Sequence, residues 1–527
     1  MIVETDSGML TKIVFSLLLS SFQFQTLHAQ GTYIGAVVEY NPYQNANKNV
    51  MLEENLKNYE FFIEEAARKK ANIVVFPEGG LKTDVLSVVP NPAEETVATC
   101  NKPDLSIIMS RISCAAQNNK IYVVINLPEM RSIEEADGVK KYKYNTNVVF
   151  DRNGAVVARY AKYNLFDEFN TNKPKEPELS FFTTDFGVTF GTFICFDILF
   201  QEPTLVLVNR YKITDFLFTS QWFSELPFLT ALQAQRGWAE ANDVNLLASG
   251  YNDPRRGSTG SGIFNGVEGS IVHYMSEKKG SKLFVAEIPK KSSINGLQKS
   301  TWRDSVLAKA SNASQFNFVF DDFTLLSDEI ELFNSEVITP EVDEHLEICS
   351  HKNFCCSFQV RVDQKSADVK NYNYRAVVFN GVRKFGLSAT GGVQACGVIL
   401  CTGPSIHNCT RRAAQMPDIY EFSYIKIEGN FKKRNALQIP TTLTTGATMD
   451  TLKPNRYEFV VKEEEDHKKV TMVLDWSVDN LQTFAIWGRD FTMDGKKPSL
   501  PVSSSVHLKL SIPLLVLVFW LTAAFGF

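Results

Sequence analysis

The sequence lacks a large charge of either sign. It has 54 Lys and Arg residues against 59 Asp and Glu residues, which gives a net charge of −5 at pH 7. No block of like charge is long enough to form a charged tail. Nucleic-acid-binding proteins concentrate basic charge on one surface, so this balance predicts no nucleic-acid partner. The 527 residues, 44% of them hydrophobic, are enough for two or more globular domains.

The sequence also lacks the paired ligands of a metal site, and it contains no internal repeat or low-complexity tract. Its histidines number seven. Cys396 and Cys401 have no second pair nearby, and His407 stands alone. Because structural zinc sites need four ligands in close pairs, we expect no metal and no other cofactor.

Cysteine is present in an odd number. Without Cys195 an even number remains, enough for four disulfides in an oxidising compartment. We expect Cys100 to pair with Cys114, whereas the last six cysteines allow 15 pairings. The nine are Cys100, Cys114, Cys195, Cys349, Cys355, Cys356, Cys396, Cys401 and Cys409.

Both ends of the chain carry apolar runs. Lys12 precedes an apolar stretch at 13–22, and Ala29 is a small residue suited to cleavage, so residues 1–29 predict a secretory signal. The alternative is a buried N-terminal helix. Residues 510–527 contain no charge and follow small residues and a polar spacer. This order predicts that 496–527 is a glycosylphosphatidylinositol attachment signal, with a plain tail anchor or a cleaved tail as alternatives.

These signals predict an extracellular protein, either held on the cell surface by a lipid anchor or secreted. The sequons at Asn312 and Asn408 predict glycosylation of surface loops. The oligomeric state stays open.

Strand and helix patterns alternate from residue 31 to about 290. A central pair of sheets covered by helices is the expected α/β architecture for 30–300. Helical periodicity falls at 52–70, 106–118 and 228–242. Strands are predicted at 33–39, 72–76, 121–127, 147–150, 156–161, 188–194, 215–220, 244–249, 261–264 and 271–274.

After residue 300 the apolar segments become short and alternating, and six of the nine cysteines lie there. This pattern predicts a separate β-rich domain at 301–495, held together by disulfides. Its predicted strands are 316–320, 358–362, 374–378, 421–428, 457–461 and 470–476.

Three chemically reactive side chains each follow a predicted strand. Cys195 ends the strand 188–194, Glu78 follows Phe76-Pro77, and Lys162 ends the strand 156–161. Opening an amide with a thiol needs a nucleophile, a base and a fixed charge for the oxyanion. Taken singly, each has a simpler reading as a buried cysteine, a turn glutamate and a strand-edge lysine. Together they predict such a site, with the backbone N–H of Phe196 beside the oxyanion.

Three motifs carry a resemblance to a known family. They are Phe76-Pro-Glu78, Lys162-x-x-Leu165-Phe166 and Cys195-x-Asp197-x-x-Phe200-x-Glu202-Pro203. The chain resembles the nitrilase superfamily of carbon–nitrogen hydrolases, and within it the biotinidase and vanin branch. The resemblance implies an αββα sandwich and hydrolysis of a vitamin amide without a cofactor. Pantetheine is the first expected substrate and biocytin the second.

The resemblance also implies the roles of individual residues. Glu78 is expected as the base, Lys162 as the oxyanion stabiliser and Cys195 as the nucleophile. Glu168 is the expected supporting acid that orients Lys162, although Asp167 is adjacent. Trp222 and Phe223 line the acyl pocket or, alternatively, pack in the core.

Two other readings remain open at this stage. In the first, the fold serves adhesion or signalling without catalysis, a reading that the intact set of three residues disfavours. A nitrilase acting on nitriles is disfavoured by the secretory signals and the second domain. Arg255 and Arg256 either favour an anionic or polar acyl group or belong to a solvated loop.

Overall fold

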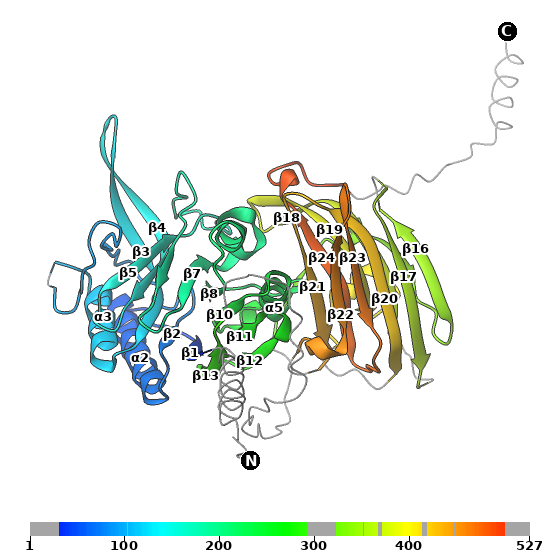
Figure 1. Cartoon of the computed structure of the whole chain (residues 1–527), viewed down its shortest axis with the longest axis horizontal. Helices are drawn as coiled ribbons and strands as arrows, with labels where there is room; N and C mark the ends of the chain where they lie inside the picture. The colour runs from blue at the N-terminus through cyan, green and yellow to red at the C-terminus, as the bar shows by residue number, and fades with distance from the viewer. Residues whose placement is uncertain are drawn as a thin grey trace, which may run out of the picture.

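The computed structural model describes residues 31–102, 104–291, 323–350, 353–366, 372–413, 419–446 and 449–500. The expected signal peptide, Asn312, the predicted strand 316–320 and residues 501–527 lie outside the described residues. Within the described part of the chain, no helix is long and apolar enough to cross a membrane. The described residues form two β-rich bodies side by side (Figure 1).

The N-terminal body contains two six-stranded sheets, in the orders β13-β1-β2-β3-β4-β5 and β12-β11-β10-β8-β7-β6. The strands of the first sheet are β1 (Thr32–Glu39), β2 (Ile73–Val75), β3 (Tyr122–Glu135), β4 (Gly138–Phe150), β5 (Val156–Ala161) and β13 (Lys282–Pro289). Those of the second are β6 (Phe181–Thr183), β7 (Thr189–Ile194), β8 (Asp215–Ser220), β10 (Asn245–Gly250), β11 (Ser261–Asn265) and β12 (Ser270–Tyr274).

The two sheets face each other through an apolar layer that includes Val75, Val124, Phe190 and Leu217. Such faces are apolar because both sides of each sheet are covered. Helices α2 (Lys48–Arg68) and α3 (Ile107–Asn119) pack on the outer face of the first sheet. Helix α5 (Ala231–Asn242) covers the second. The expected αββα sandwich is therefore confirmed.

Capping groups fix the helix starts. The Asn47 side chain accepts hydrogen bonds from the backbone of Asn49 and Val50, which begins α2. In α5, Thr230 and Gln233 form a reciprocal capping box. A short helix α4 (Val206–Asn209) follows the Glu202-Pro203 segment.

The C-terminal body is a sandwich of two five-stranded antiparallel sheets, β15-β18-β19-β24-β21 and β16-β17-β20-β23-β22. The first comprises β15 (Asn334–Val337), β18 (Asn373–Phe385), β19 (Ala389–Cys401), β24 (Leu481–Asp490) and β21 (Ala436–Thr444). The second comprises β16 (Asp343–Cys349), β17 (Cys355–Gln364), β20 (Tyr420–Lys432), β23 (His467–Leu474) and β22 (Glu458–Glu463). A short pair, β9 (Glu225–Leu226) and β14 (Leu326–Ser327), links the bodies.

The first of these sheets packs on the N-terminal body. Its residues Phe379, Ile399 and Trp487 share one apolar cluster with Phe228 and Trp238. The two bodies therefore bury a continuous core between them.

The sequence analysis missed the strands that make this contact. It named no strand at β19, β21 or β24. β24 is buried along almost its whole length, and most of β19 is buried on both faces, so their patterns do not alternate. β19 also contains Gly391, Gly392 and Gly397, and β21 contains Pro440, residues that are unusual in strands.

Four disulfides are formed, and Cys195 is the free cysteine among the nine. Cys100 pairs with Cys114, as expected. The last six cysteines, whose pairing the sequence left open, form three bonds: Cys349–Cys355, Cys356–Cys396 and Cys401–Cys409.

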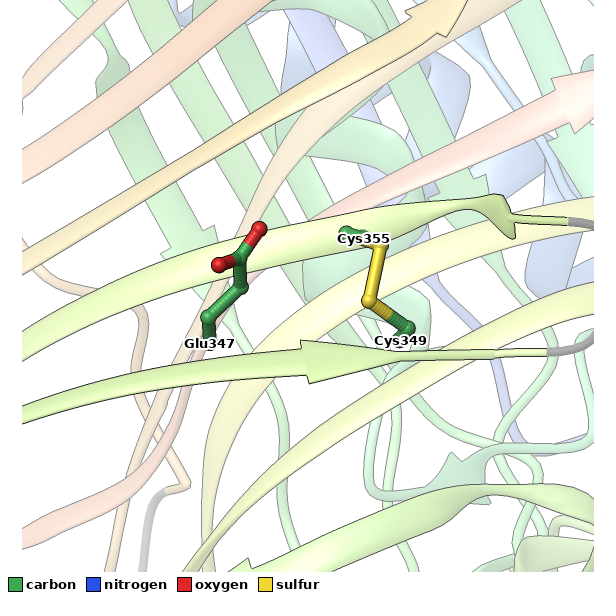
Figure 2. Close-up of side chains that lie close together, drawn as sticks. All are labelled: Glu347, Cys349 and Cys355. Carbon is green, nitrogen blue, oxygen red and sulfur yellow. A yellow bond between two sulfur atoms is a disulfide. The ribbon is translucent and has the colours of Figure 1, made fainter.

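Among the residues that the structure describes, one group of metal-type ligands occurs, on the C-terminal body, where Glu347 lies beside Cys349 and Cys355 (Figure 2). The two sulfurs are bonded to each other, so neither is a thiolate that can ligate a metal. We therefore assign this group a structural role.

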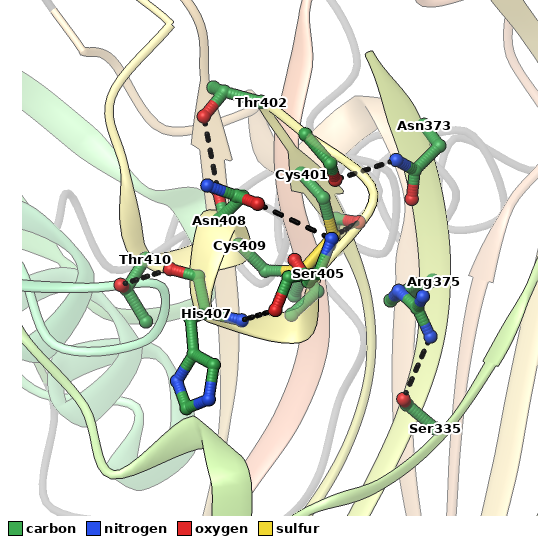
Figure 3. The surroundings of a disulfide bond; sticks show 12 residues. Ser335, Asn373, Arg375, Cys401, Thr402, Ser405, His407, Asn408, Cys409 and Thr410 are labelled. Atoms are coloured by element: carbon green, nitrogen blue, oxygen red, sulfur yellow. Dashed lines mark hydrogen bonds between the residues drawn. A yellow bond between two sulfur atoms is a disulfide. The ribbon is translucent and has the colours of Figure 1, made fainter. Parts of the chain in front are cut away.

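The sequon at Asn408 lies inside a tight turn closed by Cys401–Cys409 (Figure 3). The Asn408 side-chain oxygen accepts a hydrogen bond from the Ser405 backbone at 3.3 Å. The Thr410 hydroxyl donates to the His407 carbonyl at 3.2 Å. Glycosylation of Asn408 stays a prediction, and it has to accommodate these contacts.

Candidate active site

Cys195 lies where β7 ends and a short 3-10 turn (Cys195–Leu199) begins. Its φ is +48°, a left-handed conformation that is strained for a non-glycine residue and is typical of functional positions. The side chain is buried, and its thiol faces the Gln221 carbonyl at 3.6 Å. Burial, followed by the charge of Glu78, raises the pKa of Cys195, and Lys162 opposes this only in part. The resting group is therefore a thiol.

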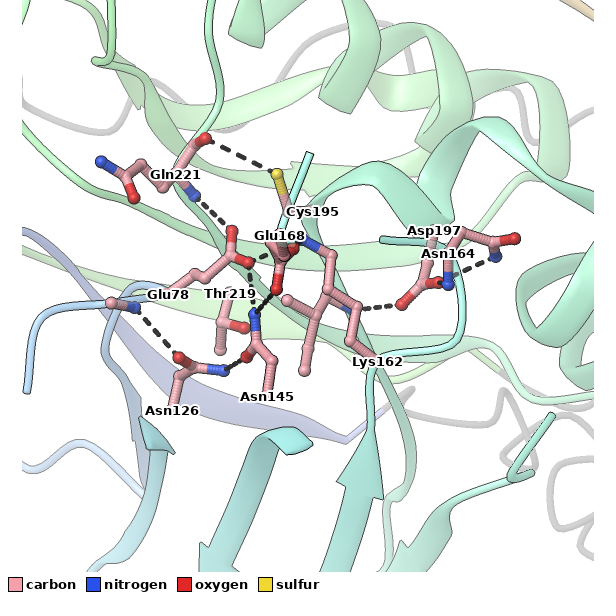
Figure 4. A network of polar contacts seen from close by, with 12 residues as sticks. Glu78, Asn126, Asn145, Lys162, Asn164, Glu168, Cys195, Asp197, Thr219 and Gln221 are labelled. Carbon is pink, nitrogen blue, oxygen red and sulfur yellow. Dashed lines mark hydrogen bonds and ion pairs between the residues drawn. The ribbon is translucent and has the colours of Figure 1, made fainter. Parts of the chain in front are cut away.

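Glu78 follows the end of β2, and its side chain lies in the same cluster of polar groups as Cys195 (Figure 4). One carboxylate oxygen accepts hydrogen bonds from Lys162 Nζ at 2.7 Å and from Asn145 Nδ2 at 2.8 Å. The other accepts from the Gln221 backbone at 2.9 Å. The Glu78 carboxylate is thus fixed by donors from three separate strands or strand ends (Figure 4).

Lys162 follows β5 and is almost completely buried between two carboxylates, Glu78 and Glu168. Burial by itself would lower the pKa of Lys162, but the two carboxylates raise it well above its ordinary value. Burial likewise opposes ionisation of Glu168, yet the Lys162 charge and hydrogen bonds from Lys162 and Asn145 lower the pKa of Glu168. Lys162 is therefore a fixed positive charge beside the thiol.

The structure separates the two acids that the sequence left adjacent. Glu168 binds Lys162 Nζ and accepts from Asn145 Nδ2 at 2.9 Å. The carboxylate of Asp167 instead accepts hydrogen bonds from the C-terminal body.

Sequence reasoning gave no role to the buried amides beneath these groups. Asn145 Nδ2 donates to both Glu78 and Glu168, and Asn126 Nδ2 holds the Asn145 oxygen at 2.6 Å. Asn126 also accepts from the Gly79 backbone at 3.0 Å. The available signal was the presence of Asn residues in otherwise apolar strands, since buried polar groups need partners.

Asp197 joins the turn that begins at Cys195 to the end of β5 and the residues that follow Lys162. One oxygen accepts from the Ile194 backbone at 3.0 Å and from the Tyr160 hydroxyl at 2.8 Å. The other accepts twice from Asn164, at 2.9 Å from the backbone and 2.9 Å from the side chain. Burial raises the pKa of Asp197 to about 6, although these donors oppose the shift. Asp197 thereby fixes the spacing between Cys195 and Lys162.

Aromatic rings pack around Phe196, the residue that follows Cys195. The Phe166 ring packs edge-on against Phe196 at 5.1 Å and parallel to Phe223 at 6.1 Å. Arg256 lies over the half-buried Phe223 ring at 5.3 Å, and both Arg255 and Arg256 are exposed.

Trp222 is buried in the core, and its indole N–H donates to the Leu229 carbonyl at 2.9 Å. This placement is that of a packed core residue. A recess of about 370 Å³ between the two bodies is lined by residues such as Gln201, Arg210 and Phe491, and it does not include the reactive groups.

Comparisons with known proteins show which chains this sequence is similar to. The carbon-nitrogen hydrolase family model matches residues 36–241, and the vanin C-terminal domain model matches 323–494. Vanin-like protein 2 of Drosophila melanogaster is 34% identical, over 90% of this chain and 93% of that protein. Pantetheinase of Bos taurus is 30% identical over 72% and 76% of the two chains. Biotinidase of Takifugu rubripes is 29% identical over 85% and 92%.

Among solved structures, an amidase from Nesterenkonia sp. is 16% identical, with a TM-score of 0.38, and covers 49% of this chain and 90% of its own. The family assignment rests on the sequence relatives and the two domain matches. The chain belongs to the vanin family of carbon–nitrogen hydrolases, and it is an amide-hydrolysing enzyme.

Proposed function

We propose that this enzyme cleaves a secondary amide through a thioester on Cys195, with pantetheine as its substrate. The observation that carries the proposal is that Glu78 binds both Lys162 and the backbone N–H of Gln221, the residue whose carbonyl faces the Cys195 thiol. A base, a nucleophile and a fixed charge are then in one buried place, which is what acyl transfer requires.

In the first half of the reaction, the Cys195 sulfur attacks the amide carbonyl carbon while its proton passes to Glu78. The negative oxygen that forms is stabilised by Lys162 Nζ and the Phe196 backbone N–H. One such donor typically lowers the barrier by about 3 kcal/mol. The carbon–nitrogen bond then breaks, and the amine leaves with the proton that Glu78 held.

In the second half, Glu78 takes a proton from water, which attacks the thioester carbonyl. The carbon–sulfur bond breaks, the free acid is released, and the sulfur regains its proton from Glu78. Glu168 keeps Lys162 charged throughout, because it supplies a second negative partner when Glu78 is protonated.

Relatives named pantetheinase and biotinidase support the substrate class at similar identities, 30% and 29%. Pantetheine would yield pantothenate and cysteamine, whereas biocytin, the alternative, would yield biotin and lysine. Disulfides are typical of extracellular proteins, which supports action outside the cell, on a lipid anchor or in secreted form.

The test uses the full chain expressed through the secretory pathway of a eukaryotic host, beside its Cys195→Ala variant. We expect cysteamine release from pantetheine by the wild type and none by the variant. Lysine release from biocytin instead would favour the biotinidase alternative. Silence on both substrates with a Cys195 that still reacts with iodoacetamide would indicate another amide. An unreactive Cys195 would contradict the proposal.

A further inference from the structure

Asp167 lies next to Glu168, the proposed supporting acid, but faces the other body of the protein. Its carboxylate accepts hydrogen bonds from the Leu387 backbone at 2.8 and 3.1 Å and from the Ser388 backbone at 3.0 Å. The Ser388 hydroxyl adds a further bond at 2.7 Å. Charge-assisted bonds of this kind are stronger than neutral ones. One carboxylate therefore joins the loop after Lys162 to the turn between β18 and β19.

The turn is shaped to bring its backbone close to that carboxylate. Gly386 has a φ of +61°, and a Cβ at this position would lie 2.3 Å from an oxygen of Asp167. The Leu387 side chain is 86% exposed, so Leu387 binds through its backbone N–H while its side chain points to solvent. A glycine is needed here both for the conformation and for the close approach.

The Asp167 loop itself is in a strained conformation. Asp167 has a φ of +53°, which places its carboxylate toward the turn and away from Lys162. Asp and Asn adopt this left-handed region more readily than most residues. The hydrogen bonds to Leu387 and Ser388 offset the cost of this strained conformation.

The neighbours of Asp167 on both sides belong to the candidate site. Glu168 binds Lys162, and the Phe166 ring packs on Phe196, the residue after the nucleophile. From the C-terminal body, the Phe385 ring packs on the same Phe196 at 5.7 Å. The end of β18 and the turn that follows it thus make two contacts with the site. The turn binds Asp167, in the loop after Lys162 (the lysine loop), and Phe385 packs on Phe196, in the turn that begins at Cys195.

We propose that Asp167 is a positioning residue, which clamps the C-terminal body to the lysine loop and so holds Glu168 and Lys162 in place beside Cys195. The inference rests on the proposed function for its catalytic consequence. It gives the C-terminal body a direct part in the geometry of the site. Small displacements matter here, since a misplacement of about 1 Å can lower a rate by about 100-fold.

Three variants test the clamp in the full-length enzyme. Asp167→Gly removes the carboxylate without adding strain at positive φ. Asp167→Asn retains the shape, the conformation and one acceptor oxygen. Ser388→Ala removes a single bond from the other body. Asp151→Gly is the matched control. The half-buried Asp151 also accepts two backbone hydrogen bonds in a turn, at 2.8 Å each. Its turn is the β4–β5 hairpin, which does not join the two bodies.

The readouts are kcat and KM for amide hydrolysis, the pH dependence of Cys195 alkylation by iodoacetamide, and the thermal midpoint. We expect Asp167→Gly to lower kcat by up to about 100-fold with KM little changed, and to alter the alkylation profile. Asp167→Asn should fall between this variant and the wild type, and Ser388→Ala should lose less. Asp151→Gly should lose stability only.

The proposal is overturned if Asp167→Gly lowers the thermal midpoint as Asp151→Gly does but keeps wild-type kcat and alkylation. If the wild type cleaves neither amide, the proposed substrate fails, while the alkylation profile still tests the clamp. A changed profile in Asp167→Gly would then support it, and an unchanged profile would contradict it.

Discussion

The two bodies of this enzyme use buried charge differently. In the N-terminal body, Glu78, Lys162 and Asp197 gather at strand ends around one thiol. In the C-terminal body, the buried cations Arg383 and Arg489 face the first body: Arg383 pairs with Glu225, and Arg489 donates to the Leu199 carbonyl. The first set of charges surrounds the thiol, whereas the second lies where the two bodies meet. Losing Glu78 or Lys162 should therefore lower turnover most, and losing Arg383 or Arg489 should lower stability most.

The largest expected effect comes from Cys195, the proposed nucleophile. Cys195→Ser should reduce amide hydrolysis by up to about a million-fold, because a hydroxyl is a far weaker nucleophile than a thiol in this site. The unfolding free energy should change little, since the substitution is nearly isosteric. Steady-state kinetics and chemical denaturation measure the two quantities. Wild-type activity in Cys195→Ser would contradict the role of Cys195 as the nucleophile.

Glu78→Gln should reduce kcat by about 1,000-fold, in the range typical of a lost general base. Because the Glu78 charge raises the pKa of Cys195, the variant should also alkylate at lower pH than the wild type. Iodoacetamide labelling across pH measures this shift. Glu135→Gln is the control, since Glu135 binds surface lysines and should leave both quantities unchanged. An upward shift in Glu78→Gln would contradict the assigned electrostatics.

At the interface, Arg489→Met should lower the unfolding free energy by about 3 kcal/mol, because it leaves Asp494 and the Leu199 carbonyl without their partner. Denaturant titration measures the loss. The exposed pair Arg361–Asp343 is the comparison, and Arg361→Met should lower the unfolding free energy far less, because solvent screens this pair. Equal losses in the two variants would contradict the docking role of Arg489.

Removing a disulfide of the C-terminal body should lower stability without lowering turnover. Replacing Cys401 and Cys409 by Ser should cost about 2.5 kcal/mol, given the short loop that their bond closes. The kcat value should stay at the wild-type level, because the bond lies away from the reactive groups. A thermal melt followed by an activity assay checks both. A large loss of kcat at full folding would show that this turn also supports the site.

The smallest expected effect is a pH dependence of stability at Asp197. Its pKa is raised to about 6 in the folded protein, above the ordinary value of 3.8, so its stabilising contribution is complete below pH 4 and is lost as the pH rises through 6. Relative to Asp197→Asn, the wild type should therefore gain about 1.4 kcal/mol between pH 7 and pH 5. Denaturation at the two pH values measures the difference. A gain in the opposite direction would contradict a raised pKa.

Most strands of the N-terminal body could be predicted from the sequence because their signals are local, although β6, β13 and the outer part of the β3–β4 hairpin were missed. A strand ending in Cys195, or in Pro77-Glu78, is visible within about ten residues of chain. The partners of Asp197 and Asn145 could not be predicted in this way, since they lie on other strands and are brought close only by the packing of two sheets.

The C-terminal body was predicted as β-rich, but its central strands were missed. β19 and β24 lie between neighbouring strands and under the N-terminal body, so their burial is set by another domain. For the same reason the sequence could not separate Asp167 from Glu168. Their roles differ because a turn more than 200 residues away along the chain meets one of them and not the other.

The central claim is that Cys195 carries the acyl group of the substrate during turnover. The most direct measurement is intact-protein mass spectrometry of enzyme mixed rapidly with pantetheine and quenched in acid, followed by peptide mapping. We predict a mass increase equal to the pantothenoyl group on the peptide containing Cys195, removable by hydroxylamine and absent in Cys195→Ala. Turnover of pantetheine with no adduct on this peptide, and with activity retained in Cys195→Ala, would contradict the account.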